Sequence, residues 1–405
     1  MTGTPNAPAR RAWVRDLVSF LVVAVLMGQW MVLRALHVSL TPGHEALFAG
    51  LGIFGAAFLL SWGAELAELE LSQALALALL ALMAVLPEYA VDMYLAWKAA
   101  HDPSYTAYAA ANMTGANRIL IGLGWPVVLF CSWGATRKRE ICLEPAQRVE
   151  LVTLLVATLY AFTIPLRRSL SLLDTVCLVG LFVVYLVQSS KAAHVTPELS
   201  GPPVHLAVCP RPLRRFLTVL LFVIPGLAIF LAAEPFANGL LQSARHLGVE
   251  EFVLIQWLAP LASESPEFIV AILFAARARA GEGLGTLISS KVNQWTLLIG
   301  MLPLVYSISG GHVMPMHLDA RQNEEIFLTV AQSLLAVIVL VNGRFGLGEG
   351  VMLAGLFLTQ LLIPSPSIRL MYGGLYILIS LGYLMNRPCR ASLRALLLHG
   401  FRAPS

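Results

Sequence analysis

The feature that most constrains this chain is a series of apolar runs, each about 20 residues long, that recurs along nearly its whole length. A helix of that length crosses the hydrocarbon core of a bilayer and satisfies its own backbone hydrogen bonds there. Of the 405 residues, 58% are hydrophobic and only 12% are charged, which is about half the charge density of a soluble protein. The sequence therefore predicts an all-α polytopic protein embedded in a lipid bilayer.

We expect about twelve transmembrane helices, with a proline- and glycine-rich boundary at 190–212 that separates two halves. The apolar segments are 14–36, 46–68, 72–97, 108–133, 149–166, 170–189, 213–246, 250–277, 284–309, 325–343, 347–364 and 368–386. The expected organisation is an N-terminal tail with an additional first helix (1–45), a first repeat (46–189), a cytoplasmic linker (190–212), a second repeat (213–364), and an additional last helix with a cytoplasmic tail (365–405).

Lysine and arginine orient these helices, because positively charged loops stay on the cytoplasmic side of a membrane. With the N-terminus inside, eighteen of the 27 basic residues fall in inside segments. Seven fall outside, namely Arg34, Lys98, Arg167, Arg168, Arg245, Arg321 and Arg369. Arg118 and Lys291 lie within apolar segments. We therefore expect both termini in the cytoplasm, and the small net charge of +4 gives no indication of nucleic-acid binding.

A proline followed by a glutamate stands in the middle of one apolar run in each half, at Pro87-Glu88 and at Pro266-Glu267. Asp92 follows Glu88 by four residues and Glu264 precedes Glu267 by three, so each pair of acids shares one face of a helix. A charge at the centre of a membrane helix costs about 2.5–3.5 kcal/mol, so such residues normally line a cavity or an ion path. Four such acids require a compensating cation.

The two halves are predicted to be inverted repeats. On the expected topology, the loop after the first motif (98–107) lies outside and the loop after the second (278–283) lies inside. Secondary transporters with this arrangement bind ions near the membrane midplane, between the two repeats.

The helix after the first motif carries Asn112 and Asn117 around Gly115, in the run Ala111-Asn112-Met113-Thr114-Gly115-Ala116-Asn117. The second half has Ala262-Ser263-Glu264-Ser265-Pro266-Glu267 and then Gly285-Thr286-Leu287-Ile288-Ser289-Ser290-Lys291. A Pro-Glu helix followed by Asn-x-x-Gly-small-Asn resembles the α-repeat of the sodium/calcium exchanger (cation/calcium antiporter) family. The resemblance covers residues 46–364 and implies an antiporter without a large regulatory loop, in the inner membrane of a bacterial cell.

The resemblance implies a set of cation ligands. Glu88 and Glu267 would be the central metal ligands, assisted by Asn112 and Asn117 and by backbone carbonyls near the two prolines. Ser263, Ser289 and Ser290 match the family's hydroxyl positions less closely. The chain departs from the family where Met83-Ala84-Val85 replaces Gly-Thr-Ser and where Lys291 replaces an Asn or Asp.

Several residues have two interpretations. Asp92 and Glu264 are either further ligands or a structural pair, and Asn112 and Asn117 either ligate a cation or join helices by hydrogen bonds. Glu88 and Glu267 could instead form structural ion pairs with Arg118 and Lys291. These two bases are otherwise coupling groups or tethered cations, since an ammonium can occupy the place of a monovalent ion.

The predicted function is secondary-active exchange of calcium for sodium or protons by alternating access. The alternatives are a sodium/proton or other monovalent cation exchanger, and a membrane scaffold that keeps the fold without transport. The five cysteines and the histidines show no metal-binding spacing, no phosphate loop or nucleophile–base set indicates an enzyme, and no cofactor is expected beyond the transported ions. The partners are therefore inorganic cations and the lipid bilayer.

Overall fold

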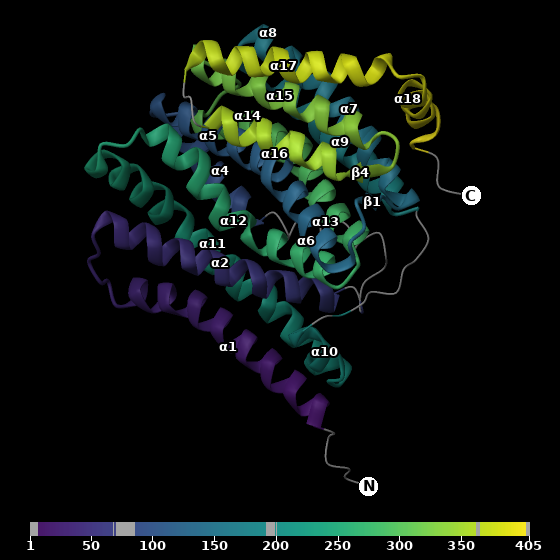
Figure 1. Cartoon of the computed structure of the whole chain (residues 1–405). Coiled ribbons are helices and arrows are strands. Elements are labelled where there is room, and N and C mark those ends of the chain that lie inside the picture. Colours follow the sequence, from purple (N-terminus) through teal and green to yellow (C-terminus); the bar gives the residue numbers. More distant parts are fainter. Residues whose placement is uncertain are drawn as a thin grey trace. The chain divides into compact units, whose positions relative to one another are not determined.

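The structure is a computed structural model that describes residues 7–67, 69, 86–191, 199, 201–361 and 365–401, and it is mainly helical (Figure 1). The helices of the first half are α1 (Ala7–Ala35), α2 (Pro42–Ala67), α4 (Leu86–Ala99), α5 (Ser104–Ile119), α6 (Trp125–Thr136), α7 (Arg148–Ala161), α8 (Thr163–Arg167) and α9 (Leu172–Ser189). Those of the second half are α10 (Pro202–Ala207), α11 (Arg211–Leu247), α12 (Glu251–Ala276), α13 (Ala280–Asn293), α14 (Ile299–Gly310), α15 (Ala320–Leu340), α16 (Leu347–Leu361), α17 (Pro366–Met385) and α18 (Arg387–His399).

Membrane-spanning helices make up most of the described chain. Eight helical stretches are long and apolar enough to cross a bilayer, and α12 adds a ninth if its two parts, bent by 57° where the sequence has Pro266, form one span. Each predicted apolar segment overlaps a described helix, although residues 68, 72–85 and 362–364 of these segments lie outside the described residues. Apolar runs did not reveal α10 in the predicted linker or α18 in the predicted tail, because α10 is short and α18 is rich in arginine.

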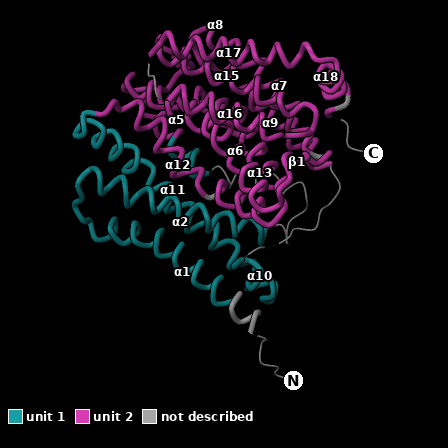
Figure 2. The backbone as a smooth tube through the Cα atoms, in the orientation of Figure 1, with its two compact units in different colours: residues 1–91, 193–248 teal, residues 92–192, 249–405 magenta. Residues whose placement is uncertain are grey.

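The described chain forms two compact units, each of which takes residues from both predicted repeats (Figure 2). Unit 1 comprises residues 1–91 and 193–248, and unit 2 comprises residues 92–192 and 249–405. The border falls within α4, so Glu88 belongs to unit 1 and Asp92, one helical turn later, belongs to unit 2.

In unit 1, α2 and α11 pack against each other in antiparallel orientation. Gly43 lies near Ser243, Gly50 against the Phe236 ring, and Gly63 against Leu221, so the contacts run in opposite directions along the two helices. Glycines permit this close approach, as is common for helices in membranes. The helices α2 and α11 are the first helices of the two predicted repeats, and they therefore point in opposite directions.

In unit 2, the helices that carry the motifs are arranged in a related way. α5 and α12 run parallel, because Tyr108 bonds to Glu251, Gly115 meets the backbone of Gln256, and Gly124 meets Phe268. α12 and α13 run antiparallel, because Gln294, just after α13, bonds to Glu264, and Gly283 meets Ala271. The equivalent helices α5 and α13 consequently point in opposite directions.

Each of these equivalent helices continues into a π-helical turn, η1 (Leu120–Gly124) after α5 and η3 (Gln294–Leu298) after α13. Both turns begin three residues after the last position of the matched motif, Asn117 in one and Lys291 in the other. π-Helical turns often mark functional sites.

Two pairs of short strands identify the two ends of unit 2. β1 (Glu140–Cys142) pairs with β4 (Arg344–Gly346) at one end, and β2 (Ser169–Leu170) pairs with β3 (Met316–His317) at the other, with α15 running between them. The α12–α13 turn belongs to the β1–β4 end, where Gln147 Nε2 donates to the Gly281 carbonyl at 3.1 Å.

The α4–α5 loop belongs to the β2–β3 end. Ser309 Oγ, close to β3 in the chain, donates to the Trp97 carbonyl at 2.7 Å and lies 3.1 Å from His101 Nε2. The loops after the two Pro-Glu motifs therefore lie at opposite ends of unit 2.

Candidate cation site

Unit 2 holds most of the predicted site residues, on four helices. Asp92 lies on α4, Asn112 and Asn117 on α5, Glu264 and Glu267 on α12, and Lys291 on α13. Glu88 belongs to unit 1, so its pairing with Glu267 as joint metal ligands stays a prediction. Met83-Ala84-Val85 lies outside the described residues.

Asp92 and Asn112 form a buried hydrogen-bonded pair. Asn112 Nδ2 donates to Asp92 Oδ1 at 2.9 Å, and the residues are 1% and 0% exposed. The α4–α5 hairpin brings them together, because both helices turn back at the short loop near His101. The bond uses the amide nitrogen and leaves the amide oxygen for another contact.

Glu264 connects the acids of the two motif helices. Gln294 Nε2 donates to Glu264 Oε1 at 2.5 Å, and Glu264 interacts electrostatically with both Asp92 and Glu267. Three carboxylates from α4 and α12 thus influence one another in a buried region. Like charges at such a place require a cation or protons to compensate them.

Lys291 and Asn117, which occupy matching positions in the two predicted repeats, bond directly to each other. Lys291 Nζ donates to Asn117 Oδ1 at 2.6 Å, and both residues are 0% exposed. The same ammonium lies 4.1 Å from the centroid of the Trp295 ring, a cation–π geometry. The Asn117 amide oxygen, which the sequence predicts as a ligand of a transported cation, therefore accepts a hydrogen bond from the Lys291 ammonium.

Several buried oxygens accept no hydrogen bond within the part of the chain that the structure describes. They are Asp92 Oδ2, Asn112 Oδ1, Glu267 Oε2, Ser290 Oγ and Gln294 Oε1. Carboxylate, amide and hydroxyl oxygens are the ligands that calcium prefers, and calcium takes six to eight of them. The nitrogens of Asn112 and Gln294 are fixed by carboxylates, so their oxygens are the atoms available to a cation.

The predicted serine ligands differ in their contacts. Ser263 Oγ donates to the Ala259 carbonyl of its own helix at 3.2 Å, and Ser289 Oγ lies 2.8 Å from the Tyr185 hydroxyl. Ser290 is the serine whose buried oxygen has no such bond within the described residues. Among the described residues, no three carboxylates, histidines or cysteines lie together in a way that could hold a metal ion.

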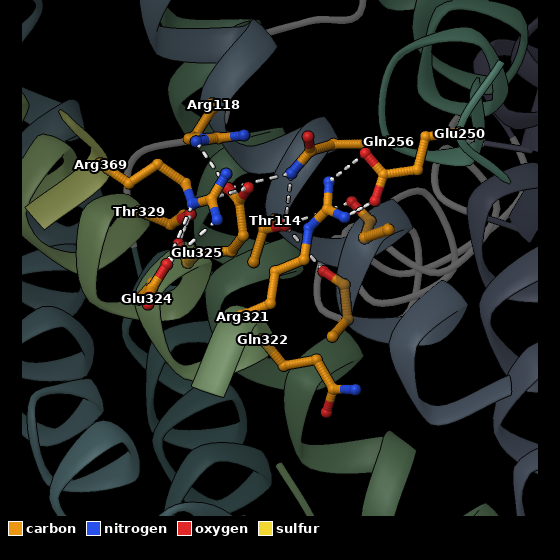
Figure 3. A network of polar contacts seen from close by, with 12 residues as sticks. Thr114, Arg118, Glu250, Gln256, Arg321, Gln322, Glu324, Glu325, Thr329 and Arg369 are labelled. Atoms are coloured by element: carbon orange, nitrogen blue, oxygen red, sulfur yellow. Dashed lines mark hydrogen bonds and ion pairs between the residues drawn. The ribbon is translucent and has the colours of Figure 1, made fainter. Parts of the chain in front are cut away.

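Arg118 belongs to a second buried polar network, which lies where α5 packs against α12 and α15 (Figure 3). Arg118 pairs with Glu325 at 2.9 Å, and the two side chains are 3% and 4% exposed. The ion-pair partner of Arg118 is therefore Glu325, and not one of the glutamates of the two Pro-Glu motifs. The Arg118 guanidinium also lies 4.8 Å from the centroid of the Trp257 ring.

Glu325 joins four helices through this network. Its Oε2 atom also accepts a bond from Gln256 Nε2 of α12 at 3.1 Å, and Gln256 in turn donates to Thr114 of α5 at 3.3 Å. Arg369 of α17 lies 3.6 Å from Glu325 and donates to Glu324 at 3.0 Å. Figure 3 shows Arg321 and Glu250 on the other side of Gln256, where an ion pair joins α15 to the start of α12.

Sequence reasoning missed Gln294, Gln256 and Glu325. Gln294 lies three residues after Lys291 and thus on the same helix face, a signal that could have found it. Glu325, Thr329 and Gln332 recur at helical spacing in an apolar segment, which was a weaker signal. Arg369, which was counted in an outside loop, is a buried residue of α17.

The sequence matches the family described as sodium/calcium exchanger protein over residues 45–191 and 217–365, which is more than half of the chain. The chain belongs to the sodium/calcium exchanger family. This family member gives no match among curated proteins. It is similar to a solved structure described as the H+/Ca2+ exchanger CAX, with 42% identity, a TM-score of 0.91, and coverage of 95% of this chain and 98% of that one.

More distant solved structures share the fold alone. The structure of native YfkE is 16% identical with a TM-score of 0.60, and the match covers 89% of this chain and 99% of that one. The sodium–calcium exchanger NCX_Mj, soaked with sodium and strontium, is 18% identical with a TM-score of 0.54, over 80% and 99% of the two chains. Membership of the exchanger family and the membrane-embedded helical fold were thus both predicted correctly from the sequence.

Proposed function

We propose that this exchanger moves calcium across a membrane in exchange for protons, by alternating access. The observation that carries the proposal is the buried set of Asp92, Glu264 and Glu267 with the free oxygens of Asn112 and Gln294. The similar structure at 42% identity is described as an H+/Ca2+ exchanger, which supports the same pair of ions.

The carboxylates can couple the two ions through charge balance. An ionised carboxylate out of water is unfavourable unless a cation or a proton compensates it. When calcium leaves, two positive charges leave with it, and two carboxylates that each take up a proton restore neutrality. Calcium that binds from the other side displaces those protons, so neither ion completes the cycle alone.

Lys291 favours protons over sodium as the driving ion. Its ammonium already occupies the oxygen of Asn117, which a second monovalent cation would need. Another cation at this place would also meet the repulsion of the fixed charge, which is several kcal/mol even at an effective dielectric of about 20. The second candidate is sodium/calcium exchange, which the family name alone favours.

The proposed architecture is about twelve membrane helices in two inverted repeats. The antiparallel packing of α2 on α11 and the opposite directions of α5 and α13 support this arrangement. The loops 100–103 and 277–279 also lie at opposite ends of unit 2. The two separate stretches that match the family are consistent with one repeat each.

The proposed orientation places the β1–β4 end and both termini in the cytoplasm of a bacterial cell. The β1–β4 end is the more basic one, with Arg137, Lys138, Arg139, Arg148, Arg277, Arg279 and Arg344 near its strands and turns. The β2–β3 end has Lys98, Arg167, Arg168 and Arg321. The positive-inside rule therefore gives the same orientation from the fold as from the sequence.

Calcium uptake into proteoliposomes tests the function. Purified protein is reconstituted, and uptake is compared under an imposed proton gradient and an imposed sodium gradient. We expect uptake to follow the proton gradient at any sodium concentration. Uptake that requires a sodium gradient would assign sodium as the driving ion, and no calcium movement under either gradient would refute the proposal.

A further inference from the structure

One acid, Glu150, lies near the β1–β4 end of unit 2 and outside the cation site. It stands in the first turn of α7, directly after the loop that follows β1. The residue as a whole is partly exposed, but its Oε2 atom is buried and accepts no hydrogen bond within the described part of the chain. This carboxylate therefore reaches from the accessible surface into the interior, where its ionised form is unfavourable unless a proton or a cation compensates it.

Tyr185 of α9 connects this carboxylate to the helix that carries Lys291. α7 packs against both α9 and α13, and Glu150 interacts electrostatically with Tyr185. The Tyr185 side chain is buried, and its hydroxyl lies 2.8 Å from Ser289 Oγ of α13. A carboxylate and two hydroxyls from three different helices thus lie in sequence from the β1–β4 end inward.

Ser289 leads toward the carboxylates of the cation site. α13 starts at Ala280 at the β1–β4 end, so at a rise of about 1.5 Å per residue Ser289 lies roughly 14 Å along the helix. The next residue, Ser290, is buried, and its Oγ atom forms no hydrogen bond within the described residues. Gln294, one turn after Ser290 on the same face, donates to Glu264. The two serines of α13, Ser289 and Ser290, therefore stand between Tyr185 and the buried acids.

The chemistry of this set suits a proton and not a metal ion. Calcium takes about six to eight oxygens, whereas this set offers one carboxylate and a few hydroxyls. A hydroxyl donates one hydrogen bond while it accepts another, so Tyr185 and Ser289 can pass a proton without holding a charge. The first turn of α7 also places Glu150 at the positive end of the helix dipole, which stabilises its ionised form and offsets part of the cost of burial.

The charged side chains on the helices packed against α7 have other partners or are exposed. The pairs are Asp174 of α9 with Arg167 of α8, Glu282 of α13 with Arg279, Lys291 of α13 with Asn117, and Arg321, Glu324 and Glu325 of α15 with Glu250, Arg369 and Arg118 respectively. The three arginines of α18 and Arg148 of α7 itself are exposed. Among the described residues, Glu150 therefore reaches the interior through the Tyr185 hydroxyl.

We propose that Glu150 is the group that exchanges protons with the cytoplasm, and that Tyr185 and the serines of α13 relay these protons to and from the cation site. The inference rests on the proposed exchange of calcium for protons. When calcium binds from the cytoplasm, a carboxylate of the site gives up its proton to the relay. Each hydroxyl releases its own proton as it accepts one, and Glu150 takes up the last of them. Glu150 then releases that proton to cytoplasmic water, so one proton leaves the site and one enters the water.

The test separates proton transfer from calcium binding. The purified full-length chain in proteoliposomes is assayed for exchange of labelled against unlabelled calcium, which needs no net proton movement, and for calcium uptake driven by a proton gradient. We expect Glu150→Gln to slow the proton-driven uptake about 100-fold, at the lower end of what a positioned proton-transfer group contributes. Tyr185→Phe should slow the same uptake, and both variants should keep calcium/calcium exchange and its KM. Glu150→Asp retains a carboxylate and should recover part of the rate.

The matched controls are Glu144→Gln and Tyr383→Phe. They remove an exposed carboxylate and a partly buried hydroxyl from the same end of the protein, and both modes of exchange should stay unchanged. Proton-driven uptake by Glu150→Gln or Tyr185→Phe at the rate of its control would overturn the relay. An equal loss of both modes would overturn it as well, because it would show a structural role. These outcomes leave the proposed antiport intact, whereas wild-type protein that moves calcium without protons would refute the proposed function and the relay together.

Discussion

Glu325→Gln is the substitution whose effect the buried network predicts most sharply. The change keeps the size of the side chain and removes its charge, so Arg118 loses its ion pair in a place where the two side chains are 3% and 4% exposed. A buried charge left without its partner typically costs 3–5 kcal/mol, so we expect the free energy of unfolding to fall by about that amount. Glu250→Gln is the matched control, because its partner Arg321 and Glu250 itself are 27% and 53% exposed, and such pairs contribute about 0–1 kcal/mol.

The same substitution should also affect the cation site, because Glu325 binds residues of both α5 and α12. α5 carries Asn112 and Asn117, and α12 carries Glu264 and Glu267. We therefore expect a higher KM for calcium in the fraction of Glu325→Gln protein that remains folded. The assay combines unfolding in mixed micelles with calcium flux normalised to folded protein. The double variant Arg118→Met with Glu325→Gln removes both charges and should recover much of the lost stability.

Equal stability of Glu325→Gln and Glu250→Gln would refute this reasoning, as would a double variant that is less stable than either single one. A KM that stays unchanged while stability falls would show that the network only holds the fold and does not position the site.

Three further predictions concern the site and the topology. Glu88→Gln and Glu267→Gln should each abolish calcium exchange without unfolding the protein, since each removes a carboxylate that the sequence predicts as a cation ligand; near-normal flux in both, with Glu250→Gln as control, would reject the ligand assignment. Lys291→Asn should introduce sodium dependence and shift the pH profile of exchange, because it removes the ammonium from Asn117; unchanged ion selectivity and pH profile would show that the ammonium has no part in coupling. In a background without native cysteines, His101→Cys should react with an impermeant thiol reagent from outside and Arg277→Cys from inside; labelling from the same side would contradict the inverted repeats.

The sequence was sufficient to identify a helical membrane protein and the family to which it belongs. Apolar runs identify spanning helices because the bilayer imposes both length and composition. The family was identified from the Pro-Glu motif of each half and from the Asn-x-x-Gly-small-Asn motif of the first half. The sequence also placed Asp92, Asn112 and Glu264 among the buried polar residues of unit 2, where the structure brings them into contact with one another or with Gln294.

The sequence was not sufficient to assign partners across long separations. Helical spacing shows which residues share a face, but it does not show which other helix that face meets. Arg118 could therefore be assigned to a motif glutamate when its partner is Glu325 of α15. The contact of Lys291 with Asn117 was equally hidden, because it depends on how α13 packs against α5.

Polar segments outside the bilayer were missed for a different reason. α18 has an apolar face, but its arginines break the continuous run that reveals a spanning helix. The pairing of β1 with β4 joins two loops that are far apart in the sequence, and neither strand is long enough to show an alternating pattern.

The central claim is that calcium moving one way is balanced by protons moving the other way through the same buried carboxylates. The most direct test is the pH inside proteoliposomes, followed with a trapped fluorescent dye as calcium is added outside in the absence of sodium. We predict that calcium entering the vesicles drives protons out, so the interior becomes alkaline, and that Glu267→Gln shows neither movement. Calcium uptake without a change of internal pH would contradict the account.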